Sequence, residues 1–298
     1  MGDQGRRVDG PAELDLPVEG GTLRVLRFGE GPRPALAAHG ITASGMAFGA
    51  FARLLPPEWS LFAPDLRGRG GSADAPGPYG LDRHAADLCR LAEGLGAGSP
   101  VALTGHSMGA YVALLAAARR PELFDRLLLV DGGLPLPVPP GADLDGILDA
   151  TLGPAIARLG LTYATDQDYV DFFRAHPALG PYWNDDVETY VRYDLTGPRG
   201  ARRSKAREDA VRQDGRDLLA SGDRFAADLE RLSVPALLLH APLGLLGQEP
   251  PMLPGDLVER WTGGPGGLPT ELVEDSNHYT ILLGDPAKTA AERFTALA

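Results

Sequence analysis

A short apolar run followed by a glycine-rich bend reads Val101-Ala102-Leu103-Thr104-Gly105-His106-Ser107-Met108-Gly109-Ala110-Tyr111. The apolar start predicts a strand, and the apolar residues after the bend recur at helical spacing. Ser107 therefore lies between a strand and a helix. Glycine at positions 105 and 109 lets the two backbones approach closely on either side of it. A serine hydroxyl held in this way can be reached by both a substrate carbonyl and a proton acceptor.

The composition is that of a globular protein with a large core. Of its 298 residues, 44% are hydrophobic and 23% are charged. This length fits one α/β unit with an insertion. The formal net charge of -12 argues against a nucleic acid or an anionic membrane as partner, because both would be repelled. The single Cys89 excludes an internal disulfide framework, and its apolar neighbours predict core packing or a partly exposed free thiol rather than a nucleophile.

Nothing in the sequence indicates a membrane or secreted protein. Residues 1–7 lead into Asp and Pro rather than into an apolar run, which predicts no secretory signal. No apolar stretch is long enough to cross a bilayer. No His, Asp and Glu spacing suggests a metal site. We therefore expect a cytoplasmic protein that uses neither a metal nor another cofactor.

Strands and helices alternate along the first half of the chain. Predicted strands over residues 14–18 and 23–28 flank Gly20-Gly21 as an opening hairpin. Later segments alternate between strands at 35–38, 60–63 and 126–130 and helices at 45–55 and 81–95. This alternation predicts parallel strands joined by right-handed crossovers. Residues that follow such strands share one sheet edge, so Ser107, His39 and Asp131 should be neighbours.

The chain changes character after Gly133. Residues 134–141 contain four prolines and predict an exit from the sheet. The following residues, to about 232, have helical periodicity, no convincing strand and many aromatic residues. We therefore predict a helical lid over residues 134–233, with most of its aromatics in its own core and a minority lining a pocket. Strands over 234–240 and 270–273 and a helix over 286–297 complete a core made of residues 1–133 and 234–298.

Four motifs, in this order, resemble the α/β-hydrolase family over nearly all of the chain except the lid. They are His39-Gly40, Asp65-Leu66-Arg67-Gly68-Arg69-Gly70-Gly71-Ser72, Gly105-His106-Ser107-Met108-Gly109 and Asn277-His278. The resemblance implies the α/β-hydrolase fold, an α/β architecture with a mostly parallel central sheet, flanking helices and an inserted helical lid.

The same resemblance implies a role for each matching residue. Ser107 corresponds to the nucleophile, and His278 to the general base that activates it. The backbone amides of Ile41 and Met108 correspond to the oxyanion hole, and the two side chains should add apolar wall to the pocket. Among the remaining histidines, His240 also ends a strand and competes with His278. Two others, His84 and His176, are expected on the surface or in the lid.

The acid of the triad is left open by the sequence. Many relatives place an aspartate shortly after the seventh strand, but residues 241–248 contain no carboxylate before Glu249. Other members carry the acid after the sixth strand, where Asp131 lies. We favour Asp131 and keep Glu249 as the alternative, although Asp131 in Asp-Gly-Gly could also serve only as a turn residue. Asp275 is disfavoured because it is only three residues from His278.

These residues predict a serine hydrolase that cleaves a carboxylic ester or lactone through an acyl-enzyme intermediate. The alternatives are a carbon-carbon bond hydrolase, a thioesterase, a cofactor-free perhydrolase, or a receptor-like relative that binds a ligand with little turnover. The aromatic lid predicts a small-molecule substrate with an apolar or aromatic portion. The sequence leaves open the identity and chain length of this substrate, its attachment to a carrier, and the oligomeric state.

Overall fold

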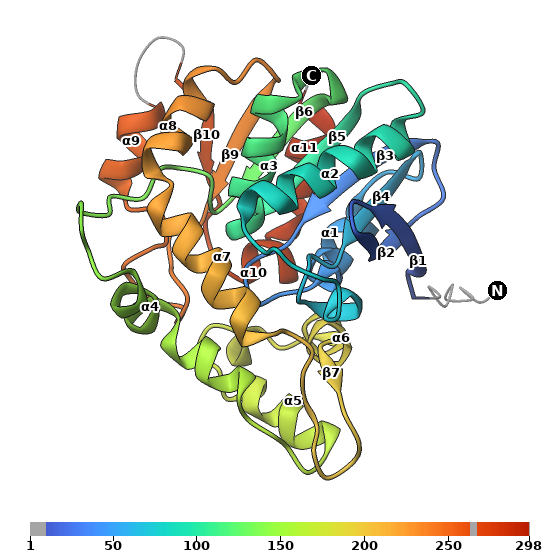
Figure 1. The fold of residues 1–298 in the computed structure, drawn as a ribbon, viewed down its shortest axis with the longest axis vertical. Helices are drawn as coiled ribbons and strands as arrows, with labels where there is room; N and C mark the ends of the chain where they lie inside the picture. Colours follow the sequence, from blue (N-terminus) through green and yellow to red (C-terminus); the bar gives the residue numbers. More distant parts are fainter. Residues whose placement is uncertain (1–9, 263–266, 298) are drawn as a thin grey trace, which may run out of the picture.

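A single eight-stranded sheet organises the protein, whose structure is a computed structural model that describes residues 10–262 and 267–297 (Figure 1). The prediction that no secretory signal is present concerns residues outside these ranges. In the sheet order β1-β2-β4-β3-β5-β6-β9-β10, β2 is antiparallel to both its neighbours and the other pairs are parallel. The strands are β1 (Ala12–Val18), β2 (Gly21–Phe28), β3 (Arg33–Ala38), β4 (Trp59–Pro64), β5 (Val101–His106), β6 (Phe124–Val130), β9 (Ala236–His240) and β10 (Thr270–Leu272).

Helices cover both faces of the sheet, which confirms the predicted α/β architecture. Helices α2 and α3 pack on one face, and α1 and α11 pack on the other. The predicted helix over residues 45–55 consists of a 3-10 turn that continues into α1. Outside the insertion described below, the helices are α1 (Gly49–Leu54), α2 (Leu81–Gly96), α3 (Met108–Arg119), α9 (Gly255–Thr262), α10 (Thr280–Leu283) and α11 (Ala287–Ala296).

Alternate residues of the central strands build two separate cores. In β5, Leu103 faces the core that includes α2 and α3, whereas Ala102 faces the core that includes α1 and α11. In β6, Leu129 and Leu128 divide in the same way. This period of two, with apolar residues on both faces, is what a buried parallel sheet requires. Cys89 is also buried in the first core, so of its two predicted placements core packing is the correct one.

The chain leaves the sheet after β6 and returns at β9, and we call the intervening residues 134–233 the insertion. Its predicted helical character is confirmed, but the prediction of no strand was wrong. Two-residue strands β7 (Leu195–Thr196) and β8 (Arg203–Ser204) pair antiparallel. Strands this short leave no periodic pattern in a sequence. The helices of the insertion are α4 (Leu144–Leu159), α5 (Asp166–Arg174), α6 (Asp185–Tyr193), α7 (Glu208–Ala220) and α8 (Gly222–Glu230).

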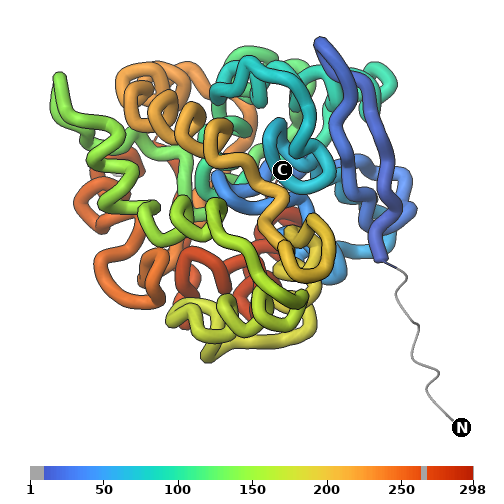
Figure 2. The backbone as a smooth tube through the Cα atoms, turned by 60° about the horizontal axis from the view of Figure 1, so that its bottom comes forward, coloured from blue at the N-terminus to red at the C-terminus, as the bar shows by residue number. Residues whose placement is uncertain are grey.

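The insertion lies mostly along one edge of the sheet. Helices α4 to α6 occupy the lower part of Figure 1, and Figure 2, which turns this side forward, shows the segments from α4 to α7 running across it. Helix α8 instead packs on α3, where the rings of Phe225 and Tyr111 have centroids 4.7 Å apart. Within the described ranges, no helix is both long enough and apolar enough to cross a membrane.

Candidate active site

Ser107 lies on a strained bend between β5 and α3. Its backbone has φ 55° and ψ −125°, in a region that residues with side chains rarely occupy. The Ser107 amide donates a hydrogen bond to the carbonyl of Val130 over 2.9 Å, which fixes the bend to β6. A Cβ on Gly105 would collide with the carbonyl of Gly109. The predicted close approach of strand and helix is therefore confirmed.

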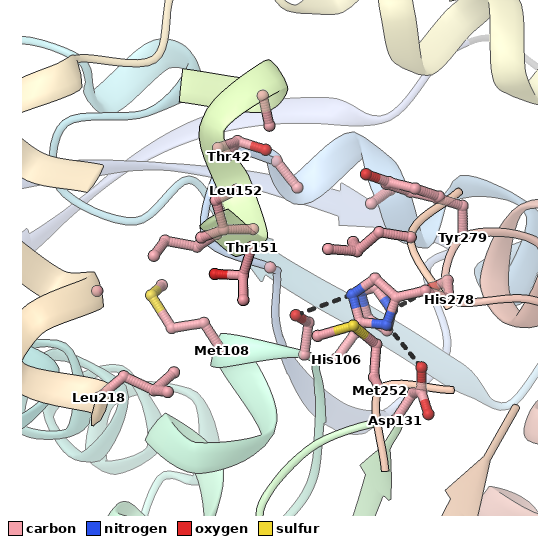
Figure 3. Close-up of a pocket in the computed structure, with 18 of the residues that line it drawn as sticks. Thr42, His106, Met108, Asp131, Thr151, Leu152, Leu218, Met252, His278 and Tyr279 are labelled. Atoms are coloured by element: carbon pink, nitrogen blue, oxygen red, sulfur yellow. Dashed lines mark hydrogen bonds and ion pairs between the residues drawn. The ribbon is translucent and has the colours of Figure 1, made fainter. Parts of the chain in front are cut away.

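The structure brings Ser107, His278 and Asp131 into one hydrogen-bonded chain (Figure 3). The Nε2 atom of His278 lies 3.0 Å from the Oγ atom of Ser107. Its Nδ1 atom lies 2.6 Å from Oδ2 of Asp131. Because a carboxylate only accepts, Nδ1 carries the proton and Nε2 is left to accept the proton of the serine hydroxyl.

Of the two candidate acids, only Asp131 contacts His278. Its other oxygen, Oδ1, accepts a hydrogen bond from the amide of Ala241 over 3.1 Å, so both carboxylate oxygens are held in place. Asp131 also adopts φ 47°, so it forms the turn after β6 at the same time. Glu249 is exposed on the loop after β9. The imidazole that contacts Ser107 is that of His278, not that of His240.

The loop of Gly40 and Ile41 lies directly against Ser107. A Cβ added to Gly40 would stand 3.3 Å from Cβ and 3.7 Å from Oγ of Ser107. Across the described residues, the amides of Ile41 and Met108 donate no hydrogen bond to the protein. Met108 begins helix α3, so its amide is one of the free donors of a helix N-terminus. Both amides are thus available to an anionic oxygen near Ser107.

His39 fixes the orientation of this loop. Its Nε2 atom accepts a hydrogen bond from the amide of Leu66 over 2.9 Å, so Nδ1 carries the proton and donates to the carbonyl of Gly40 over 2.8 Å. Burial lowers the pKa of His39 to about 3, which keeps the ring neutral, as this pairing requires. In a planar trans peptide the next N–H points opposite to the carbonyl. Holding the Gly40 carbonyl therefore also holds the amide of Ile41.

Two buried side chains support the site from behind. His106 lies under His278, with ring centroids 4.7 Å apart, and its Nε2 atom contacts the His278 carbonyl over 2.7 Å. Burial lowers the pKa of His106 to about 3. The Nε atom of Arg69 donates to the carbonyl of Ile41 over 2.9 Å. The loop that carries His278 and the loop that carries Ile41 are thus both anchored through a main-chain carbonyl.

Arg69 also connects the site to the insertion. Asp214, in α7, accepts hydrogen bonds from Arg69, from His84 over 2.9 Å and from the amide of Gly80 over 2.6 Å. Burial opposes ionisation of Asp214, but the charge of Arg69 and the hydrogen bonds from Arg69 and His84 outweigh it and lower the pKa of Asp214 to about 2. The prediction that His84 lies on the surface or in the lid was wrong. It is fully buried because its partner, distant in sequence, folds over it.

A cavity of about 260 Å³ opens in front of Ser107 and His278. Ile41 and Met108 form part of its wall, as predicted, and the insertion supplies a further wall. No Arg or Lys side chain is found among the described residues that line it. The apolar lining contributed by the insertion and the loop after β9 consists mainly of Leu136, Leu148, Leu152, Pro154, Leu218, Leu219, Leu245, Leu246, Met252 and Leu253.

A profile of the alpha/beta hydrolase family matches residues 35–292, which include every motif discussed above. The chain belongs to this family. Among the described residues, no group of three or more His, Cys, Asp or Glu side chains could hold a metal ion.

Individual relatives of this α/β hydrolase have several activities. Lipase LipV of Mycobacterium tuberculosis is 37% identical over 131 residues, which cover 44% of this chain and 48% of the lipase. N-formylmaleamate deformylase of Pseudomonas putida is 39% identical over 107 residues, 36% of this chain and 40% of that enzyme. The chain thus spans less than half the length of these two relatives.

A solved structure extends the likeness to the whole fold. The crystal structure of E-2-(acetamidomethylene)succinate hydrolase has a TM-score of 0.77 over 96% of this chain and 99% of its own. Its sequence is 22% identical, so this likeness concerns the fold alone.

Proposed function

We propose that this α/β hydrolase is a serine hydrolase that cleaves a carboxylic ester or lactone through an acyl-enzyme intermediate. The observation that supports this most is the hydrogen-bonded chain from Ser107 through His278 to Asp131, with separations of 3.0 and 2.6 Å. This is the arrangement in which a histidine takes the proton of a serine hydroxyl while a carboxylate fixes its tautomer.

In the proposed reaction, Oγ of Ser107 attacks the substrate carbonyl as its proton passes to Nε2 of His278. His278 then gives this proton to the leaving alcohol oxygen, and the acyl group stays bound to Ser107. A water molecule, deprotonated by His278, attacks the acyl-enzyme and restores the serine. The amides of Ile41 and Met108 stabilise the oxyanion of both tetrahedral intermediates, each donor lowering the barrier by about 2.7–4 kcal/mol.

We further propose that helices α4 to α7 act as a lid that sets the substrate class. Leu148 and Leu152 from α4 and Leu218 from α7 cover the cavity in front of Ser107. Burying an apolar substrate portion against them is favoured by about 25 cal/mol for each Å² removed from water. The substrate expected here is a small molecule with an apolar or aromatic portion next to its ester group.

A second candidate is hydrolysis of a carbon–nitrogen bond, favoured by the similarity to N-formylmaleamate deformylase. Maleamates carry a carboxylate, which a cationic side chain would bind best. The described cavity wall lacks one, so we place neutral esters first. Thioesters and carbon-carbon substrates could use the same three residues, and a substrate panel separates these reactions.

The test has two parts. A fluorophosphonate probe should label Ser107, and p-nitrophenyl acetate should give a burst of p-nitrophenol; both should be lost in Ser107→Ala. Esters, lactones, thioesters, formamides and diketones of matched size are then compared by kcat/KM, and the highest value is expected for an ester or lactone. Absence of labelling and burst would favour the receptor-like alternative, and a higher value for another bond type would replace the ester assignment.

A further inference from the structure

The cavity is apolar on one side and carries polar side chains on the other. Figure 3 shows Met108 and Leu218 on one side of the cavity, whereas Tyr279 lies on the other side, above His278. Tyr190 of α6 and His176, between α5 and α6, also line the cavity. Tyr279 and His176 meet edge to face, with ring centroids 5.5 Å apart.

Both tyrosine hydroxyls lack a partner in the protein. Tyr190 is only 8% exposed, yet neither its hydroxyl nor that of Tyr279 makes a hydrogen bond with any described residue. Burial raises the pKa of both phenols, so they remain protonated donors. Both residues line the cavity, and neither hydroxyl oxygen is sealed from it, so a ligand in the cavity can accept a hydrogen bond from either.

His176 provides a third donor. Its Nδ1 atom accepts a hydrogen bond from the amide of Ala178 over 3.2 Å, so the proton of the neutral ring lies on Nε2. Burial lowers the pKa of His176, which keeps the ring neutral. Over the described residues, Nε2 has no acceptor in the protein.

Two other polar side chains of the cavity already have an acceptor in the protein. The hydroxyl of Thr151 donates to the carbonyl of Ile147 over 2.8 Å, and that of Tyr111 donates to the carbonyl of Leu134 over 2.9 Å. The contrast leaves Tyr190, Tyr279 and His176, together with the hydroxyl of Thr42, as cavity donors without an acceptor among the described residues.

We propose that Tyr190, Tyr279 and His176 form a second, polar subsite that binds a neutral hydrogen-bond-accepting oxygen of the substrate, such as a keto or ether oxygen, apart from the scissile carbonyl. The inference rests on the proposed function because the same cavity must hold the ester at Ser107. The acceptor is neutral because no Arg or Lys side chain lies on the described cavity wall. Tyr190 belongs to the insertion and Tyr279 follows His278, so the substrate bridges the lid and the catalytic loop.

The test compares matched substrates in Tyr190→Phe and Tyr279→Phe, which remove only the hydroxyls. Pairs of esters of equal length are used, with and without one keto group at successive positions of the acyl chain or of the alcohol. For the best keto ester, each variant should lower kcat/KM about three- to tenfold relative to its alkyl match, as loss of one neutral hydrogen bond predicts. Tyr182 is an exposed tyrosine of the insertion, so Tyr182→Phe serves as the control. It should leave kcat/KM unchanged for both esters of each pair.

The subsite would be overturned if Tyr190→Phe and Tyr279→Phe changed kcat/KM equally for the keto and the alkyl ester of every pair. It would also be overturned if Tyr182→Phe caused the same loss of kcat/KM for the keto ester. Melting temperatures of all three variants separate this result from misfolding. Binding to Ser107→Ala, measured by calorimetry with the intact esters, makes the test independent of turnover. If Ser107→Ala binds the keto ester more tightly than its alkyl match, and this preference disappears in Ser107→Ala/Tyr190→Phe, the subsite is supported. This holds even if the wild type cleaves no ester; in that case only the proposed function fails. Equal binding of both esters rejects the subsite alone.

Discussion

At the scale of single residues, the hydrogen bond to Nδ1 of His278 distinguishes the two candidate acids. Asp131 makes this bond over 2.6 Å, whereas Glu249 is exposed. We predict that Asp131→Asn lowers kcat by about four orders of magnitude, because an amide in this place favours the wrong tautomer of the histidine. Glu249→Gln should leave kcat unchanged. Steady-state hydrolysis of a p-nitrophenyl ester measures both, and the reverse outcome would reassign the acid to Glu249.

His39 gives a second prediction at this scale. Its Nδ1 proton holds the Gly40 carbonyl, and through the shared peptide it holds the amide of Ile41. If that amide stabilises the oxyanion as proposed, His39→Ala should lower kcat about 10²- to 10³-fold, the usual effect of losing one donor. KM should change little, because the donor acts mainly on the transition state. If the fall in kcat were fully explained by loss of folded protein, seen as a lower melting temperature, this role of His39 would be contradicted.

The sequence could predict which side chains lie together in the site only where those side chains belong to a recognisable motif. Ser107 and His278 came from local motifs, and the structure brings them together across 171 positions of the chain. The sequence favoured Asp131 but could not exclude Glu249, because either loop end could reach the histidine. His84 was misplaced for a related reason. Its acceptor Asp214 lies 130 residues away, and no local period records such a pair.

At the scale of elements, helix α7 is joined to the core by the buried pair of Asp214 and Arg69. We predict that Asp214→Leu lowers the free energy of unfolding by about 3–5 kcal/mol, because it leaves the Arg69 charge buried without its partner. The double variant Arg69→Met/Asp214→Leu should recover most of this loss, since it removes both charges. Urea unfolding of the wild type, both single variants and the double variant forms a complete cycle.

A double variant as unstable as Asp214→Leu alone would show that the other partners of Asp214, His84 and the amide of Gly80, account for the loss. In either case the activity of the folded double variant is informative. Arg69 also holds the carbonyl of Ile41, so kcat should fall even where stability is recovered.

Most elements long enough to show a period could be predicted from sequence, although the eight-residue helix α9 was not. The strands of the sheet and helices α2 and α11 were placed within a few residues of their observed bounds. The paired strands β7 and β8 and the single turn of α10 were not predicted, because segments of two to four residues are too short to show a period. Tertiary contacts determine these short pieces. The hydroxyl of Tyr193, next to β7, donates to Asp65 of the core over 2.6 Å.

At the scale of the whole molecule, alternation of strands and helices is what makes an active site possible. It places the carboxyl ends of β5 and β6 and the loop after β10 at one edge, where residues far apart in sequence become neighbours. Several titratable groups near that edge are also removed from water. His39 and His106 are both fully or almost fully buried there. This burial makes the stability of the molecule depend on pH.

We predict that the free energy of unfolding falls as the pH is lowered from about 6.5 towards 5. In the unfolded chain a histidine titrates near pH 6.5, whereas burial lowers the pKa of His39 and of His106 to about 3. The unfolded state therefore binds protons first, and each histidine contributes a loss of up to about 1.4 kcal/mol per pH unit below 6.5. Asp214 does not contribute in this range, because its carboxyl is ionised both in the folded state, where its pKa is about 2, and in the unfolded chain, where an aspartate titrates at about pH 3.9.

For His39 and His106 together, the free energy of unfolding is therefore expected to change by up to about 2.7 kcal/mol per pH unit. At lower pH Asp65 opposes this change, because burial raises the pKa of its carboxyl. Urea unfolding at pH 7, 6 and 5 measures the slope. His106→Gln keeps a side-chain donor near the carbonyl of His278 but removes one titrating group. The dependence of its unfolding free energy on pH should therefore be smaller than that of the wild type by the contribution of one proton, up to about 1.4 kcal/mol per pH unit. Equal slopes for the two proteins would mean that His106 is protonated in the folded state, and that the neutral ring beneath His278 is wrongly assigned.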